Sequence, residues 1–148
     1  VRTMAEIAEE TERHIDYAKR FRTNEFVIHD RVDAISHATC GMAIDIGAKV
    51  IVVTSMSGMT VRMVSRFRAP MDIVGMATNK RVWYKLSLSW GVLPVLSEQF
   101  NSTDVLFYHA LRAARDTMHL QPGDNVVMTG GITNGKSGNT NLIKIEAV

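Results

Sequence analysis

The sequence predicts an α/β fold, namely a three-layer αβα sandwich around a five-stranded mixed sheet that is mostly parallel with one antiparallel strand. The first observation behind this prediction is an alternation of apolar runs with helical patterns between residues 30 and 118. Such alternation implies right-handed crossovers and a parallel sheet covered by helices on both faces. The second observation is that the last two predicted strands have no helix between them, which suits an antiparallel return.

Residues 2 to 21 are expected to form one long helix, because apolar residues recur there at spacings of three and four. The segment from Arg22 to Asp30 breaks this period and is interpreted as a linker. The chain is therefore divided into residues 1–22 and an α/β domain over residues 23–148. We expect the apolar stripe of the first helix to pack against another copy or to fray.

Capping residues place the helices of the domain. Asp30, Asn79 and either Ser102 or Thr103 are suitable N-caps, and Gly47 suits the position just after a helix. Helices are expected at 31–46, 60–68, 79–90 and 102–118, and strands at 49–53, 72–75, 91–96, 125–129 and 140–145. The face expected to be buried on the first of these helices carries Val32, Ile35, Thr39, Met42 and Ile46.

Composition excludes several classes of protein. The formal net charge of +2 is too small for a surface that neutralises nucleic-acid phosphates, and no apolar run is long enough to span a membrane. The single cysteine, Cys40, cannot form an internal disulfide and is expected to be buried and inert. With no secretory signal at the start of the sequence, we expect a cytoplasmic protein.

The segment from Gly130 to Ser137 satisfies the phosphate-loop pattern G-x-x-x-x-G-K-[ST] and follows a predicted strand. That motif needs a helix beginning at Lys136, whose first amides hold the phosphates. Here Gly138, Asn139 and a β-type run follow instead, which argues against a nucleotide hydrolase. The remaining interpretations are a long hairpin turn and a loop that folds over a neighbouring ligand.

A better candidate for anion binding is the segment from Thr54 to Thr60, which lies between the first strand of the domain and the next helix. It holds four hydroxyl side chains in seven residues, and Gly58 permits close backbone approach. Unpaired amides at a helix start, the positive end of the helix dipole and hydroxyl groups together suit a phosphoryl group. An ordinary helix cap without a ligand fits the same spacing equally well.

No catalytic or metal-binding grouping stands out. The five histidines have no carboxylate or cysteine partners at metal-ligand spacing, and no nucleophile, base and acid are grouped as hydrolases require. We therefore expect no catalytic residue, no metal site and no cofactor in this chain.

Taken in order, several stretches resemble the C-terminal part of pyruvate kinases. The first resembles the last helix of that family's catalytic barrel, and the others resemble its C-terminal regulatory domain. The matching stretches are residues 1–8, 37–55, 55–60, 64–70, 90–94, 122–124, 129–131 and 137–144. Their order and spacing make the resemblance specific, and it implies the α/β fold of that regulatory domain for residues 23–148.

The resemblance implies an allosteric enzyme of glycolysis that transfers phosphate from phosphoenolpyruvate to ADP, giving pyruvate and ATP. Such kinases use Mg²⁺ and K⁺ and act as cytoplasmic homotetramers. The family's catalytic groups and its ADP, ATP and phosphoenolpyruvate sites belong to the barrel, so none can be transferred to these 148 positions. We expect the full-length protein to be a phosphotransferase and this chain alone to be inactive.

The resemblance also implies an effector site. The family's effector-phosphate loop matches Thr54, Ser55, Ser57, Gly58 and Thr60, and its lid matches the late loop at Gly135, Lys136, Ser137 and Gly138. The expected ligand is a sugar phosphate or a nucleotide monophosphate, and the domain is expected to contribute to the subunit interface.

Two departures bear on this expectation. Members that respond to fructose bisphosphate have a tryptophan and an arginine near the positions of Asn101 and Tyr108, which favours a ligand with one phosphate, or no effector at all, over fructose 1,6-bisphosphate. Met56 and Met59 stand where many relatives have small polar or basic groups, so affinity could be low. The alternative hypothesis is a free-standing phosphosugar-binding module without catalysis.

Overall fold

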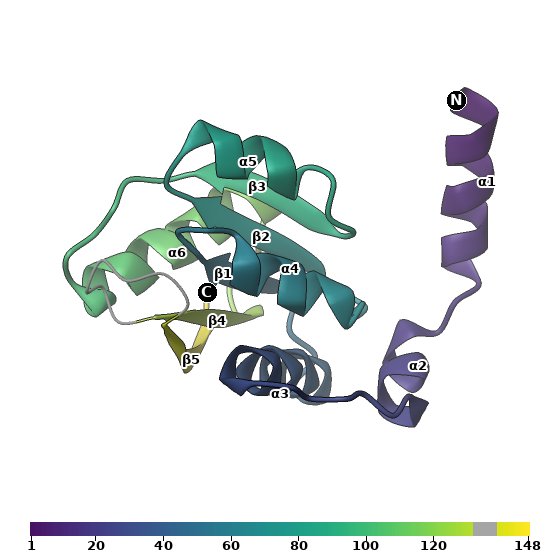
Figure 1. Cartoon of the computed structure of the whole chain (residues 1–148), viewed down its shortest axis with the longest axis horizontal. Helices are drawn as coiled ribbons and strands as arrows, with labels where there is room; N and C mark the ends of the chain where they lie inside the picture. Colours follow the sequence, from purple (N-terminus) through teal and green to yellow (C-terminus); the bar gives the residue numbers. More distant parts are fainter. Residues whose placement is uncertain (132–138) are drawn as a thin grey trace.

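The computed structural model describes residues 1–131 and 139–148. Its elements in chain order are α1 (Arg2–Arg13), α2 (Tyr17–Thr23), α3 (Arg31–Asp45), β1 (Val50–Thr54), α4 (Met59–Arg66), β2 (Asp72–Ala77), α5 (Lys80–Leu86), β3 (Val92–Leu96), α6 (Thr103–Met118), β4 (Asn125–Gly131) and β5 (Thr140–Ala147). Figure 1 shows α1 at one end of the molecule, outside the layered part.

The five strands form one mixed sheet in the order β3-β2-β1-β4-β5. β1 pairs in parallel with β2 and β4, and β2 pairs in parallel with β3. Only β4 and β5 are antiparallel, with a register irregularity between Gly130 and Gly131. The predicted fold class, including the single antiparallel strand, is thus confirmed.

Helices cover both faces of the sheet, as a parallel sheet requires. One apolar cluster joins side chains of α3, α4 and α5 to one face, and a second joins α6 to the other. All five residues of β1 are buried, because the strand lies at the centre of the sheet between the two helical layers. This central position brings the carboxyl end of β1 to the edge where α/β sheets commonly bind ligands.

The long helix predicted for residues 2–21 is wrong in one respect, because the structure has two helices there. Asp16 is the N-cap of α2, and its side chain accepts a hydrogen bond of 2.9 Å from the Lys19 backbone amide. An aspartate caps a new helix better than it continues an old one. α1 buries no residue, whereas Phe21 of α2 is 7% exposed within the main apolar cluster. The division into residues 1–22 and 23–148 stays a prediction.

The buried face of α3 also differs from the prediction. The helix buries Asp33, Ser36, Thr39, Cys40 and Ala43. Of the predicted face only Thr39 is buried, and Met42 is 36% exposed. Part of this buried face lies against α4, since Asp33 pairs with Arg66 and the Cys40 thiol lies 3.7 Å from the carbonyl of Val64.

Most other elements lie where the sequence placed them. The predicted caps are observed at Asp30 and Asn79, whose side chains accept amide hydrogen bonds from Asp33 at 2.8 Å and Val82 at 2.9 Å. β2 is longer than predicted. α5 ends at Leu86 rather than near residue 90, because the chain turns there before Gly91, which has a φ of 65°.

Candidate functional site

The segment from Thr54 to Thr60 lies at the carboxyl edge of the central strand and leads directly into α4. Ser55 donates a backbone hydrogen bond of 3.2 Å to the carbonyl of Met76, so the segment begins against the end of β2. Thr54 is 8% exposed and Thr60 is 2% exposed, whereas Ser57 and Met59 are exposed and Ser55 is half-buried. The segment therefore presents one side to solvent and keeps the other side in the core. We call these seven residues the anion loop.

Gly58 is the N-cap of α4 and has a φ of 74°, a left-handed conformation that favours glycine. A Cβ at this position would lie 2.9 Å from a methyl carbon of Val82 and 3.2 Å from a methyl carbon of Leu86. The glycine is thus required both by its backbone conformation and by close contact with α5. Its carbonyl accepts the backbone hydrogen bond of Arg62 at 3.1 Å, which closes the first turn of α4.

The four hydroxyl side chains of the anion loop divide into two pairs. The Thr54 hydroxyl donates to the carbonyl of Thr129 at 3.4 Å, and the Thr60 hydroxyl lies 2.6 Å from that of Thr140. These two threonines hold the loop in place. Ser57 is exposed and its Oγ accepts a long 3.4 Å hydrogen bond from the Met59 amide, while Ser55 is half-buried. The two serines are therefore the more exposed pair of hydroxyl side chains in the loop.

The anion loop contacts both ends of the β4–β5 connection. A Cβ on Gly130 would collide with the hydroxyl of Thr54, so this glycine allows the end of β4 to approach the loop. At the start of β5, Thr140 pairs with Thr60. The predicted lid residues Gly135, Lys136, Ser137 and Gly138 lie outside the described residues.

The surroundings of the loop favour an anion over a cation. α4 directs its N-terminus, the positive end of the helix dipole, toward the loop. α5 begins with Lys80 and Arg81, both exposed, next to the Val82 that contacts Gly58. The sequence analysis did not single out these two basic residues, which begin the helix whose Val82 and Leu86 lie against Gly58.

The sequence analysis also assigned no role to Thr140, whose hydroxyl lies against that of Thr60. It stands 80 positions after Thr60, and nothing in the local sequence indicates that their hydroxyls meet. Asn101 and Tyr108, the positions of the expected departure, lie respectively before and within α6 on the other face of the sheet.

Grouping and burial determine what the other chemically reactive side chains can do in the part of the chain that the structure describes. Among those residues, no three His, Cys, Asp or Glu side chains are grouped so that they could hold a metal ion. Cys40 is fully buried, and burial raises the pKa of its thiol to about 12 from an ordinary value of 9.0. The expectation of a buried thiol is confirmed, and its inertness stays a prediction that the raised pKa supports, since the reactive species is the thiolate.

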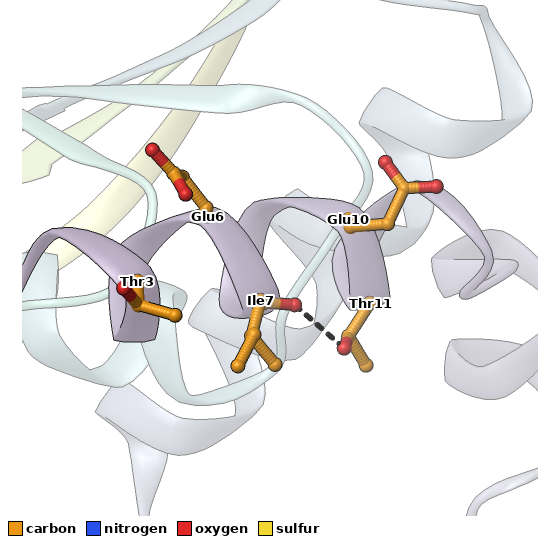
Figure 2. A pocket seen from close by; sticks show the side chains of 5 residues that line it. All are labelled: Thr3, Glu6, Ile7, Glu10 and Thr11. Atoms are coloured by element: carbon orange, nitrogen blue, oxygen red, sulfur yellow. Dashed lines mark hydrogen bonds between the residues drawn. The ribbon is translucent and has the colours of Figure 1, made fainter.

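A shallow pocket runs along α1, as Figure 2 shows. All of its lining residues belong to that one helix: Thr3, Glu6, Ile7, Glu10 and Thr11. The Thr11 hydroxyl donates to the carbonyl of Ile7 at 2.7 Å, so it is satisfied within the helix. A hollow lined by one exposed helix alone encloses no ligand site. No helix among residues 1–131 and 139–148 is both long enough and apolar enough to cross a bilayer.

The fold defines a class of protein, an α/β domain with a mixed five-stranded sheet whose central parallel strand leads into a hydroxyl-rich loop and a helix. The chain is a member of the pyruvate kinase family, since residues 33–146 match the family model described as "Pyruvate kinase, alpha/beta domain". It corresponds to the C-terminal domain of those enzymes, as the resemblance implied.

Curated relatives agree over the whole chain. It is 36% identical to the pyruvate kinase of Clostridium acetobutylicum, 31% to that of Lactobacillus delbrueckii subsp. bulgaricus and 32% to that of Staphylococcus saprophyticus. Each comparison covers 100% of this chain and 32%, 26% and 25% of the respective relative. The chain thus spans between a quarter and a third of the length of the curated relatives it matches.

Proposed function

We propose that this chain is the effector-binding regulatory domain of a pyruvate kinase and that its anion loop binds a phosphorylated small molecule. The observation that carries the proposal is the loop itself, in which two threonines are held by the sheet and two serines stand beside the first turn of α4. The phosphoryl group would accept hydrogen bonds from Ser55, Ser57 and the first amides of α4. A sugar phosphate or a nucleotide monophosphate fits this chemistry.

The activity proposed for the full-length protein is transfer of phosphate from phosphoenolpyruvate to ADP, in the cytoplasm and as a homotetramer. Mg²⁺ and K⁺ would act at the catalytic domain, as the membership of the pyruvate kinase family implies. Matches to pyruvate kinases along the entire chain favour this proposal over a free-standing phosphosugar module.

Calorimetric titration of the chain with glucose 6-phosphate and with AMP tests the site. Ser57→Ala should weaken binding of the responsive ligand by roughly 10-fold, because one charge-assisted hydrogen bond is lost. Ser102→Ala is the matched control, since Ser102 is, like Ser57, an exposed serine at the start of a helix, and as the N-cap of α6 it makes no side-chain cap bond. Equal affinities in the wild-type chain and in Ser57→Ala would remove the loop from the proposal.

In the full-length enzyme, steady-state rates should rise with the same ligand and lose that response in Ser57→Ala. Activation that persists unchanged in the variant would mean that the effector binds elsewhere.

A further inference from the structure

α4 connects the anion loop with the segment that follows α2. Its N-cap is Gly58 of the loop. Its last residue, Arg66, donates a hydrogen bond to the carbonyl of Val27, which lies in the segment of residues 24–29. The helix has eight residues, so at about 1.5 Å per residue it spans roughly 12 Å. A ligand bound at the start of α4 would therefore be separated by only this short helix from residues 24–29, which connect α2 to α3.

The Arg66 side chain is the polar contact at that end. Its Nη1 lies 3.3 Å and 3.5 Å from the two carboxylate oxygens of Asp33, and its Nη2 donates to the carbonyl of Val27 at 3.1 Å. Asp33 is 3% exposed, and one of its oxygens also accepts a 3.2 Å hydrogen bond from the His29 backbone amide. Through this fork, α4 is bonded to α3 and to Val27 directly, and to His29 only by way of Asp33.

Phe67, the C-cap of α4, supplies the apolar contact. Its ring is 2% exposed and lies 5.0 Å from that of Phe26, 5.3 Å from that of His37 and 6.4 Å from that of Phe21. These partners come from the segment 24–29, from α3 and from α2, respectively. Aromatic rings packed at such distances leave no room for one to move alone.

A shift of α4 at its loop end must therefore be accommodated by the contacts of Arg66 and Phe67. We propose that these two residues couple occupancy of the anion loop to the order of residues 24–29, so that ligand binding at the start of α4 tightens the segment at its end. This inference rests on the proposed function of the loop. It assigns a role to the Val64–Pro70 stretch, which the effector site itself does not use.

Hydrogen exchange of the amides in residues 24–29 of the full-length protein tests the coupling, with and without saturating glucose 6-phosphate or AMP. In the wild type, the ligand should slow this exchange by roughly 5-fold or more, the lower end of typical couplings between sites. Arg66→Gln should abolish most of that slowing while leaving the affinity for the ligand within about 2-fold.

The control is Arg22→Gln, which removes an exposed 3.2 Å ion pair between Arg22 of α2 and Asp45 of α3. This variant should keep the full response, because its pair contacts neither α4 nor residues 24–29. If Arg66→Gln does not fold, Arg66→Lys keeps the charge but lacks the planar fork, and it should at least halve the response.

The outcomes separate the two proposals. If calorimetry detects no binding of either ligand to the wild type, the proposed function fails and this inference fails with it. If a ligand binds but exchange in residues 24–29 does not change, or changes equally in Arg66→Gln and Arg22→Gln, only the coupling is overturned. Loss of the response in Arg66→Gln alone supports it.

Discussion

α1 and α4 have the same kind of amphipathic pattern but opposite surroundings. α1 buries no residue, and its apolar side chains Met4 and Ile7 are 74% and 62% exposed. α4 buries four residues against the sheet and α3, and both of its ends make specific contacts with other elements. Amphipathic spacing thus predicts that a helix has a face to cover, and only the rest of the protein determines whether this chain covers it.

The largest expected effect is on the free energy of unfolding, and it is found by truncating one apolar side chain at each of the two helices. Phe67→Ala should lower the free energy of unfolding by about 3–5 kcal/mol, because it leaves a cavity in the aromatic cluster at the end of α4. Ile7→Ala should change it by less than about 0.5 kcal/mol, because that side chain is already in water. Urea denaturation of the chain measures both, and a comparable loss in the two variants would contradict the contrast between the helices.

A comparison of two glycines measures how much the close contact with α5 at the start of α4 matters for stability. Gly58 and Gly47 both have positive φ, 74° and 62°, but a Cβ would collide with α5 only at Gly58. Gly47→Ala should therefore cost about 1 kcal/mol for the left-handed conformation alone. Gly58→Ala should cost a further 1–3 kcal/mol, about the usual effect of overpacking. Equal midpoints of chemical denaturation would show that α5 gives way to the added methyl group.

Cys40 tests the packing of α4 against α3, since its thiol lies 3.7 Å from the carbonyl of Val64. The folded-state pKa of the thiol is raised to about 12 from 9.0, so its contribution to stability is complete below pH 9. That contribution is lost as the pH rises from 9 toward 12, because only the unfolded chain can ionise there. At pH 10 the loss should be about 1.4 kcal/mol.

Denaturation at pH 8 and at pH 10 measures this loss, with Cys40→Ala as the control that lacks the thiol. The difference between the two pH values should be larger in the wild type than in the control. Identical differences would mean that the thiol is accessible to hydroxide in the folded state.

The smallest expected effect concerns the threonine pair that holds the anion loop. Thr60→Val and Thr140→Val should each cost about 1 kcal/mol, since each removes the same hydrogen bond. The double variant should cost less than the sum of the two, and a double-mutant cycle measures that coupling. Strict additivity would show that the two hydroxyls do not depend on one another.

Much of the layered fold was predictable from local patterns. The run from Val50 to Thr54 is apolar at nearly every position, as a strand buried on both faces must be. Asp30 and Asn79 begin helices because their side chains accept amide hydrogen bonds three residues further on. The candidate anion loop was predictable for a similar reason, since hydroxyls and a glycine between a strand and a helix form a local signature.

Two features of the helices were not predicted, for different reasons. The start of α2 has a local signal, the capping aspartate Asp16, which the apolar spacing across it concealed. The buried face of α3 has no such signal. Its apolar residues Val32, Ile35 and Met42 lie beside the buried face, and Asp33 is buried because Arg66 pairs with it.

What the sequence determined by itself is the set of elements and the turn residues between them, because strand runs, caps and left-handed glycines act over a few neighbouring positions. Tertiary structure alone decided the pairing of Thr60 with Thr140, the fork of Arg66 on Asp33 and Val27, and the exposure of α1. The first two depend on residues that stand 33 to 80 positions apart in the sequence. The exposure of α1 depends on whether another part of the protein covers it, which its own sequence does not specify. Contacts at that separation exist only once the sheet has closed and its helices have packed.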